Sequence, residues 1–243
     1  MSARMLFVTA TDTEAGKTAV ASALAVLLRR RGRDVGVMKP FASGCSDADG
    51  ELVSADGLCL ARAAGAGDPH ELICPIRLRH PLAPMAAAEL AGQELDLSVV
   101  RAAIDRLAAS HDCLIVEGIG GIMVPITPHY RVADFAAELK APVLIVARAG
   151  LGTINHSLLT VDAVRSRGLD VAAVLLNSPV ESAGGLAEET NRGVIARLSG
   201  VPVLGPLPHC RGVSVETGEL GGLPDMLAAL DGVDGLIANY LEA

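Results

Sequence analysis

Short, wholly apolar segments alternate along this chain with longer segments whose apolar residues recur at helical spacing. We expect a strand in each apolar segment, at residues 5–9, 35–38, 113–116, 142–147, 171–176 and 201–204. Helices are expected between and after them, at residues 18–31, 99–110, 132–139, 153–167, 186–198 and 226–240. Strands that are apolar along their whole length are buried on both faces, which is typical of a parallel sheet. With right-handed crossovers, the pattern predicts an α/β fold with a three-layer, doubly wound, mostly parallel sheet.

Composition argues against several classes of partner. The net charge is −8 and only 2% of residues are aromatic, so we expect no nucleic acid partner. The apolar runs are much shorter than the ~20 residues that a membrane-spanning helix needs. The five cysteines include no C-x-x-C pair, and no signal-peptide pattern opens the chain. We therefore expect a soluble cytoplasmic protein with free thiols, and, since no linker or repeat divides the pattern, a single domain over residues 1–243.

The segment Thr11 to Thr18 reads T-D-T-E-A-G-K-T and lies between the first expected strand and the first expected helix. Backbone amides at a helix start bind phosphate, a lysine there reaches the β and γ oxygens, and the next hydroxyl holds Mg²⁺. Gly16, Lys17 and Thr18 supply the last turn of such a loop. A lysine at the positive end of a helix is unfavourable unless an anion joins it. The segment therefore predicts a P-loop that binds ATP and Mg²⁺.

The loop departs from the usual Walker pattern at its start. Thr11 stands five residues before Gly16, where that pattern has glycine. Asp12 stands where the partitioning ATPases carry their signature lysine, which disfavours that branch. In an open α/β sheet, ligands bind beyond the carboxyl ends of the strands. The loops that begin near residues 9, 39, 117, 147 and 177 are therefore expected to line the site.

Two charged residues at expected strand ends are candidates for catalysis and metal binding. Lys39 is followed at once by Pro40, and a cation here would stabilise charge on a transferring phosphoryl group. Glu117 ends a buried strand, where a carboxylate can complete a Mg²⁺ shell. The glycines that follow Glu117 allow a ligand to approach the backbone. The alternative for both residues is an ordinary solvated charge at the end of a strand.

Four motifs in order resemble the dethiobiotin synthetase family. They are FVTATDTEAGKT around the phosphate loop, the K-P-x-x-S-G segment at residues 39–44, the E-G-x-G-G run at residues 117–121, and GLGTINH at residues 150–156. The resemblance runs from residue 5 to about residue 210. It implies a P-loop NTPase-like fold, use of ATP and Mg²⁺, and a homodimer. It also implies that the substrates are 7,8-diaminononanoate and CO2 or bicarbonate, and that the product is a cyclic urea.

The same resemblance implies roles for individual residues. Lys39 and Lys17 would be catalytic, Ser43 would contact the substrate, and Thr18, Asp56 and Glu117 would hold the metal. The nucleotide would be bound by Thr13, Glu14, Ala15, Gly16, Lys17, Thr18, Glu117, Gly118, Gly120, Asn177, Leu207, Pro208 and His209. The side-chain amide of Asn177 could pair with adenine. Taken alone, Asp56 could instead be the N-cap of a following helix.

The resemblance also singles out Ala10, which stands where the family usually has glycine. If that position needs a positive φ, Ala10 would be strained. Residues 81–86 correspond to the family's substrate-side loop, and residues 185–195 to a region of dimer contacts.

Two other functions remain open on the sequence. A related P-loop amidoligase would normally carry a glutamine-hydrolysing domain, for which 243 residues leave no room. A regulatory nucleotide-binding module would hydrolyse ATP slowly and would have no need of Lys39.

Overall fold

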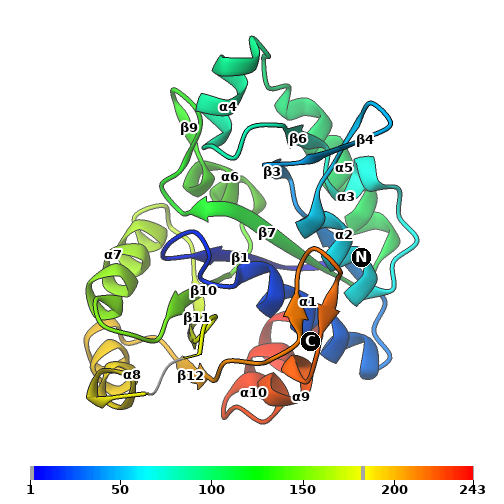
Figure 1. Cartoon of the computed structure of the whole chain (residues 1–243). Helices are drawn as coiled ribbons and strands as arrows, with labels where there is room; N and C mark the ends of the chain where they lie inside the picture. The colour runs from blue at the N-terminus through cyan, green and yellow to red at the C-terminus, as the bar shows by residue number, and fades with distance from the viewer. Residues whose placement is uncertain (1–2, 182–183, 243) are drawn as a thin grey trace.

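Six strands form one parallel sheet in the computed structural model, which describes residues 3–181 and 184–242 (Figure 1). The strand order across the sheet is β12-β11-β10-β1-β7-β2, and every neighbouring pair is parallel. These strands are β1 (Arg4–Ala10), β2 (Val35–Met38), β7 (Cys113–Gly121), β10 (Val143–Arg148), β11 (Val171–Asn177) and β12 (Val203–Leu207). The larger helices are α1 (Lys17–Arg30), α2 (Ala55–Ala64), α4 (Pro84–Ala91), α5 (Leu97–Ser110), α6 (Val132–Leu139), α7 (Thr153–Arg165) and α8 (Leu186–Ser199).

Two apolar cores lie on opposite faces of this sheet, because successive side chains of a strand point to opposite sides. Leu6 and Val8 of β1 belong to one core, together with residues of α1, α2, α9 (Leu223–Ala228) and α10 (Val233–Ile237). Phe7 belongs to the other core, together with residues of α5, α6, α7 and α8. The predicted three-layer α/β fold with a parallel sheet is therefore confirmed.

Short elements between the main strands were not predicted. They are β3 (Phe41–Ser43), β4 (Ser46–Ala48), β5 (Glu51–Val53), α3 (His70–Ile73), β6 (Ile76–Leu78), β8 (Pro125–Thr127), β9 (Tyr130–Arg131), β13 (Val213–Ser214) and β14 (Glu219–Leu220). The strands among them pair two by two outside the central sheet, as in β3 with β6 and β4 with β5. Strands of two or three residues are too short to show a period in the sequence.

The predicted final helix at residues 226–240 is wrong. Its residues are divided among α9, α10 and a π-helical turn, η1 (Ala238–Glu242). The break is at Gly232, which has φ 90° and precedes the first turn of α10. A glycine in this left-handed conformation ends one helical segment and reorients the next. The expected strand at residues 201–204 also lies further along, at Val203–Leu207.

The conditional expectation of strain at Ala10 is not met. Ala10 is the last residue of β1 and is not among the described residues with positive φ. The left-handed non-glycine residue of the loop is Glu14, with φ 54°. No helix in the described part of the chain is long and apolar enough to cross a membrane.

Candidate nucleotide and metal site

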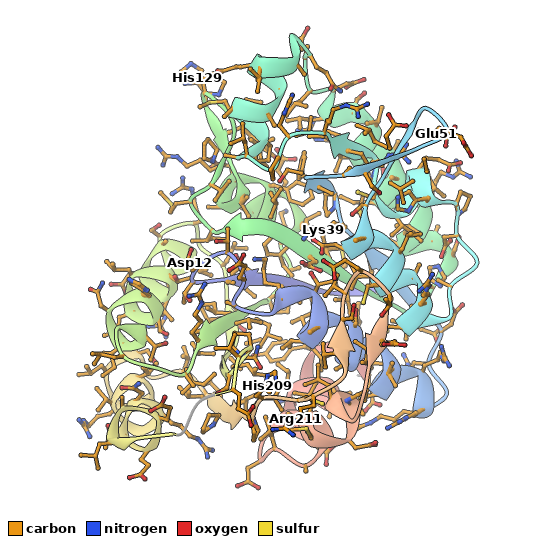
Figure 2. All side chains as sticks on the ribbon, in the orientation of Figure 1. Asp12, Lys39, Glu51, His129, His209 and Arg211 are labelled. Carbon is orange, nitrogen blue, oxygen red and sulfur yellow. The ribbon has the colours of Figure 1, made fainter. Side chains whose placement is uncertain are left out.

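The phosphate loop and the ends of β2 and β7 meet at the carboxyl edge of the sheet, because β1 and β2 both pair with β7. This brings Lys39, one residue after β2, beside Glu117 of β7 and the start of α1. Figure 2 shows Lys39 near the middle of the molecule, whereas Glu51 and His129 lie at its edge. The sheet topology therefore assembles residues that are far apart in the sequence.

The phosphate loop is braced from β11. Gly16 precedes α1 with φ 93°, and a Cβ atom at this position would collide with Nδ2 of Asn177. That Nδ2 donates to the carbonyl oxygen of Ala15 at 2.9 Å. Glycine is thus required at position 16 both by its backbone angle and by the approach of Asn177. The loop leads into the N-terminus of α1, where backbone amides and the helix dipole favour an anion.

A second brace comes from Arg148, at the end of β10. Its guanidinium donates to the carbonyl oxygen of Thr13 at 2.9 Å. Neither this contact nor the contact of Asn177 with the loop was predicted from the sequence. The bracing role of Asn177 leaves its side-chain oxygen and one N–H available, since an amide has two donors.

Lys39 is held between two carboxylates. Its Nζ lies 2.6 Å from Oε1 of Glu117 and 2.7 Å from Oδ2 of Asp56. The same ammonium donates to the carbonyl oxygen of Gly118 at 3.3 Å. The hydroxyl of Thr18 donates to Oε1 of Glu117 at 2.8 Å. The structure therefore brings the three predicted metal-site residues together around the predicted catalytic lysine.

Burial and pairing shift the pKa values of these groups in different directions. Burial alone would lower the pKa of Lys39, but Glu117 and Asp56 raise it well above its ordinary value. Burial opposes ionisation of Asp56, yet Lys39 holds the pKa of that carboxyl below its ordinary value. Burial raises the pKa of Glu117, against the effect of Lys39. Burial, followed by the charge of Lys39, lowers the pKa of Lys17 to about 8.

The donor set fits a hard cation. Glu117 is fully buried, and its Oε2 has no hydrogen-bond partner in the structure. A buried carboxylate oxygen without a partner is costly, which points to a ligand at this position. Among the described residues, no three His, Cys, Asp or Glu side chains form a metal cluster. Two carboxylates and a hydroxyl suit Mg²⁺, which takes its remaining ligands from water and phosphate.

Asp56 is free for this position because another residue caps its helix. Ser54 is the N-cap of α2, and its Oγ accepts from the amide of Gly57 at 3.1 Å. The alternative interpretation of Asp56 as an N-cap is therefore wrong.

A cavity of about 570 Å³ lies against this cluster. Its walls come from the phosphate loop and the start of α1, from the ends of three strands, and from other loops. The lining residues are Thr13, Glu14, Gly16, Lys17, Thr18, Ala19, Lys39, Ser43, Asp56, Pro81, Glu117, Ile119, Gly120 and Val215. Ser43 and Pro81 place β3 and the expected substrate-side loop at the same cavity as the phosphate loop. The lining by Val215 was not predicted.

Two further cavities continue on the β11 side. One, of about 500 Å³, is lined by Glu14, Arg148, Asn177 and neighbouring residues, so it shares Glu14 with the first cavity. The other, of about 330 Å³, is lined in part by Pro208 and His209. Leu207, by contrast, is fully buried in the core, so its side chain forms no wall of this cavity. An elongated ligand could extend from the charge cluster toward β12.

Comparisons with known proteins find relatives over most of the chain. A family model described as an AAA domain matches residues 4–217. The ATP-dependent dethiobiotin synthetase BioD of Bacillus subtilis subsp. natto is 43% identical over 222 residues, covering 88% of this chain and 91% of that protein. The protein of the same name from Anaeromyxobacter dehalogenans (strain 2CP-C) is 49% identical over 174 residues, covering 72% and 76%.

Among solved structures, apo McdA from Cyanthece superposes with a TM-score of 0.58 at 15% identity, covering 96% of this chain and 99% of that one. At that identity the likeness shows a shared fold and nothing further. The sequence matches are much closer and cover most of both chains. The chain therefore belongs to the dethiobiotin synthetase family of ATP-dependent enzymes.

Proposed function

We propose that this protein converts 7,8-diaminononanoate, CO2 and ATP into dethiobiotin, ADP and phosphate in biotin biosynthesis. The observation that carries the proposal is the position of Lys39. Its ammonium lies at the cavity that the phosphate loop lines, between Asp56 and Glu117. The names of the relatives give the product and the use of ATP, and the charges around Lys39 support a reaction that transfers a phosphoryl group.

The proposed reaction has three steps. One substrate amine attacks CO2 and loses a proton, which gives a carbamate. A carbamate oxygen then attacks the γ-phosphorus of ATP, the bond to the β-phosphate oxygen breaks, and a carbamic-phosphoric anhydride forms. The second amine attacks the carbonyl carbon and loses a proton, and phosphate leaves as the cyclic urea closes.

The residues of this chain would mainly position and neutralise charge. Backbone amides from Gly16 to Thr18 would bind the triphosphate, and Lys17 would contact its oxygens. Lys39 would stabilise charge on the carbamate and on the transferring phosphoryl group. Thr18, Asp56 and Glu117 would hold Mg²⁺, which neutralises charge on the β- and γ-phosphates.

The remaining predicted residues would orient the two ligands. Ser43 lies at the cavity beside Pro81, where its hydroxyl would contact the diamine. Asn177, Pro208 and His209 line the cavities on the β11 side, where the adenine would bind.

We further propose that two copies pair and that the enzyme works in the cytoplasm. Two leucines near the β11 side are unusually exposed for apolar residues, Leu151 at 96% and Leu186 at 79%. All five cysteines are free, as a reducing compartment would keep them. Light scattering should give a molar mass near twice 24.9 kDa. A mass of one chain at micromolar concentration would contradict the dimer.

The reaction is tested by mixing the purified protein with ATP, Mg²⁺, bicarbonate and the diamine. We expect dethiobiotin by mass spectrometry and one ADP for each product molecule. Lys17→Ala should reduce the rate by roughly 10²-fold or more. Lys140→Asn is the matched control, because Lys140 is exposed and its φ of 52° suits asparagine. ADP release that does not depend on the diamine would overturn the proposal.

A further inference from the structure

The two hydrogen bonds and the ion pair with Asp56 that hold the Lys39 ammonium have a consequence for metal binding. We propose that Lys39 is an internal counter-cation that occupies the position between Asp56 and Glu117 where the divalent metal binds, so that metal binding displaces it. The inference rests on the metal ligands assigned under the proposed function. It adds a second role for Lys39, as the residue that positions those ligands before the metal arrives.

An ammonium group has three N–H donors, and in this structure the Lys39 ammonium has three oxygen partners. It donates to Oε1 of Glu117 at 2.6 Å and to the carbonyl oxygen of Gly118 at 3.3 Å, and it forms an ion pair with Oδ2 of Asp56 at 2.7 Å. Lys39 is only 2% exposed, so water cannot readily replace any of them. With three partners already in contact, the ammonium is not free to approach a phosphate or carbamate oxygen. Lys39 must give up at least one of these partners before it can act on a reacting group.

The ammonium also lies where a metal shared by the two carboxylates would have to bind. A Mg²⁺ ion lies about 2.1 Å from its oxygen ligands. An ion bound to the two oxygens that Lys39 contacts, Oε1 of Glu117 and Oδ2 of Asp56, would take the place of its ammonium. Two cations in one buried position would repel each other strongly. Metal and Lys39 therefore compete for the same carboxylate oxygens.

The hydrogen bonds around Glu117 indicate why such a counter-cation is useful. Oε1 accepts from both Lys39 and Thr18, whereas Oε2 has no partner. Without a cation, the buried carboxylate of Glu117 would face that of Asp56 unneutralised, an arrangement that proteins avoid. Lys39 keeps both carboxylates and the Thr18 hydroxyl close together. The metal ligands are thus preorganised, but metal binding is weakened in the absence of nucleotide.

The test is Mn²⁺ binding to the nucleotide-free protein. Binding is measured as the loss of the free-ion signal in electron paramagnetic resonance. Mn²⁺ takes the same oxygen ligands as Mg²⁺. Lys39→Gln removes the charge and keeps a hydrogen-bond donor. We expect it to tighten Mn²⁺ binding by about tenfold or more, because the Lys39 ammonium no longer occupies the metal position and no longer reduces the apparent affinity for the metal. Lys17→Gln is the matched control, since it removes another buried lysine charge from the same cavity. It should tighten binding by less than about threefold.

Two results would overturn the inference. Unchanged affinity in Lys39→Gln would mean that the metal binds elsewhere, for instance through Oε2 of Glu117 with Lys39 in place. Equal gains in both variants would mean that only the net charge of the cavity matters. Either result is independent of dethiobiotin formation by the wild-type protein, so failure of the inference and failure of the proposed function can be told apart.

A measurement on the wild-type protein covers the case in which Lys39→Gln does not fold. The chain has three lysines, and Lys140 is exposed and serves as an internal reference. Acetylation by an amine-reactive ester, quantified by peptide mass spectrometry, should be slow at Lys39 in the metal-free protein. Saturating Mn²⁺ without nucleotide should raise the rate at Lys39 relative to Lys140. An unchanged ratio would overturn the inference.

Discussion

Strands β2 and β7 are bridged at both ends by a basic side chain held between two carboxylates, and the two bridges lie in different surroundings. At the carboxyl end the basic side chain is Lys39. At the amino end it is His111, just before β7. Its Nδ1 lies 2.8 Å from Oδ1 of Asp34, just before β2, and its Nε2 lies 3.0 Å from Oδ2 of Asp68.

The difference lies in burial and in what is left unpaired. Both ring nitrogens of His111 have a partner, and the side chain of Asp34 is 63% exposed. At the other end Glu117 is fully buried with an unpaired oxygen, and the bridge lines a cavity. A partly exposed bridge whose polar atoms are paired has no need of a further ligand, whereas a buried and incompletely paired one is costly unless a ligand completes it. The comparison indicates that the amino-end bridge serves the fold and the carboxyl-end bridge serves the reaction.

The largest expected effect is on the reaction rate, which should depend on Lys39 and not on His111. Lys39→Ala should lower the rate of dethiobiotin formation by roughly 10²-fold or more, because the transferring group loses its cation. His111→Gln should leave the rate per folded molecule within about twofold, since it lies at the opposite end of the sheet. Steady-state rates of both variants, normalised to the folded fraction, check this. Comparable losses would break the comparison.

The second effect concerns stability. Lys39→Met leaves the charge of Glu117 buried without its partner, which should reduce the free energy of unfolding by about 3–5 kcal/mol. Adding Glu117→Gln should recover part of that loss, because the uncompensated charge is removed. His111→Gln should cost about 1 kcal/mol or less, as expected for a partly solvated ion pair. Urea denaturation of the four proteins measures these differences, and equal losses from Lys39→Met and His111→Gln would contradict them.

Two glycines, one packed near each bridge, allow stability and ATP binding to be tested separately. A Cβ atom at Gly36 of β2 would lie 2.6 Å from Cδ2 of His111, whereas a Cβ at Gly16 would collide with Asn177. Gly36→Ala should cost about 1–3 kcal/mol through overpacking and leave ATP affinity unchanged. Gly16→Ala should abolish measurable ATP binding, because the loop itself must move.

Gly152→Ala is the matched control for Gly16→Ala. Gly152 precedes α7 with φ 92°, but no atom lies within 4 Å of its added Cβ. The control therefore keeps the backbone strain and lacks the collision. Isothermal titration with a non-hydrolysable ATP analogue measures the affinities. A loss of binding in the control as well would assign the effect to strain alone.

The sequence predicted the sheet because its central strands are apolar along their whole length, a pattern with few alternatives. It predicted Lys39 and Glu117 because a charged residue directly after such a strand lies at the ligand end of the sheet. It could not predict that β7 lies between β1 and β2, since strand order depends on contacts between distant residues. The bridge between Lys39 and Glu117 depends on that order.

Other features left no local signal. Asn177 lies 162 residues from Ala15, and nothing near either residue indicates their hydrogen bond. The contact of Arg148 with Thr13 spans 135 residues, and no local sequence pattern indicates it either. The final helix was predicted across Gly232, because a glycine within an apolar pattern can either be tolerated or break the helix. Which of these occurs is decided by packing.

The smallest expected effect is a pH dependence that belongs to the amino-end bridge alone. Burial opposes protonation of His111, but its hydrogen bond to Asp34 and the charge of Asp68 raise its pKa above the ordinary value. A histidine whose pKa is higher in the folded protein adds stability that is fully present below the unfolded pKa of about 6.5 and is lost as pH rises through the folded pKa. The thermal midpoint of the wild type should therefore fall by about 1–3 °C relative to His111→Gln between pH 6 and pH 9. Groups that titrate in both proteins cancel in that difference, which isolates His111. A difference that is flat across this range would mean that the imidazole bridges the two aspartates in its neutral form. The two ends of the strands would then share an arrangement of side chains but not a buried positive charge.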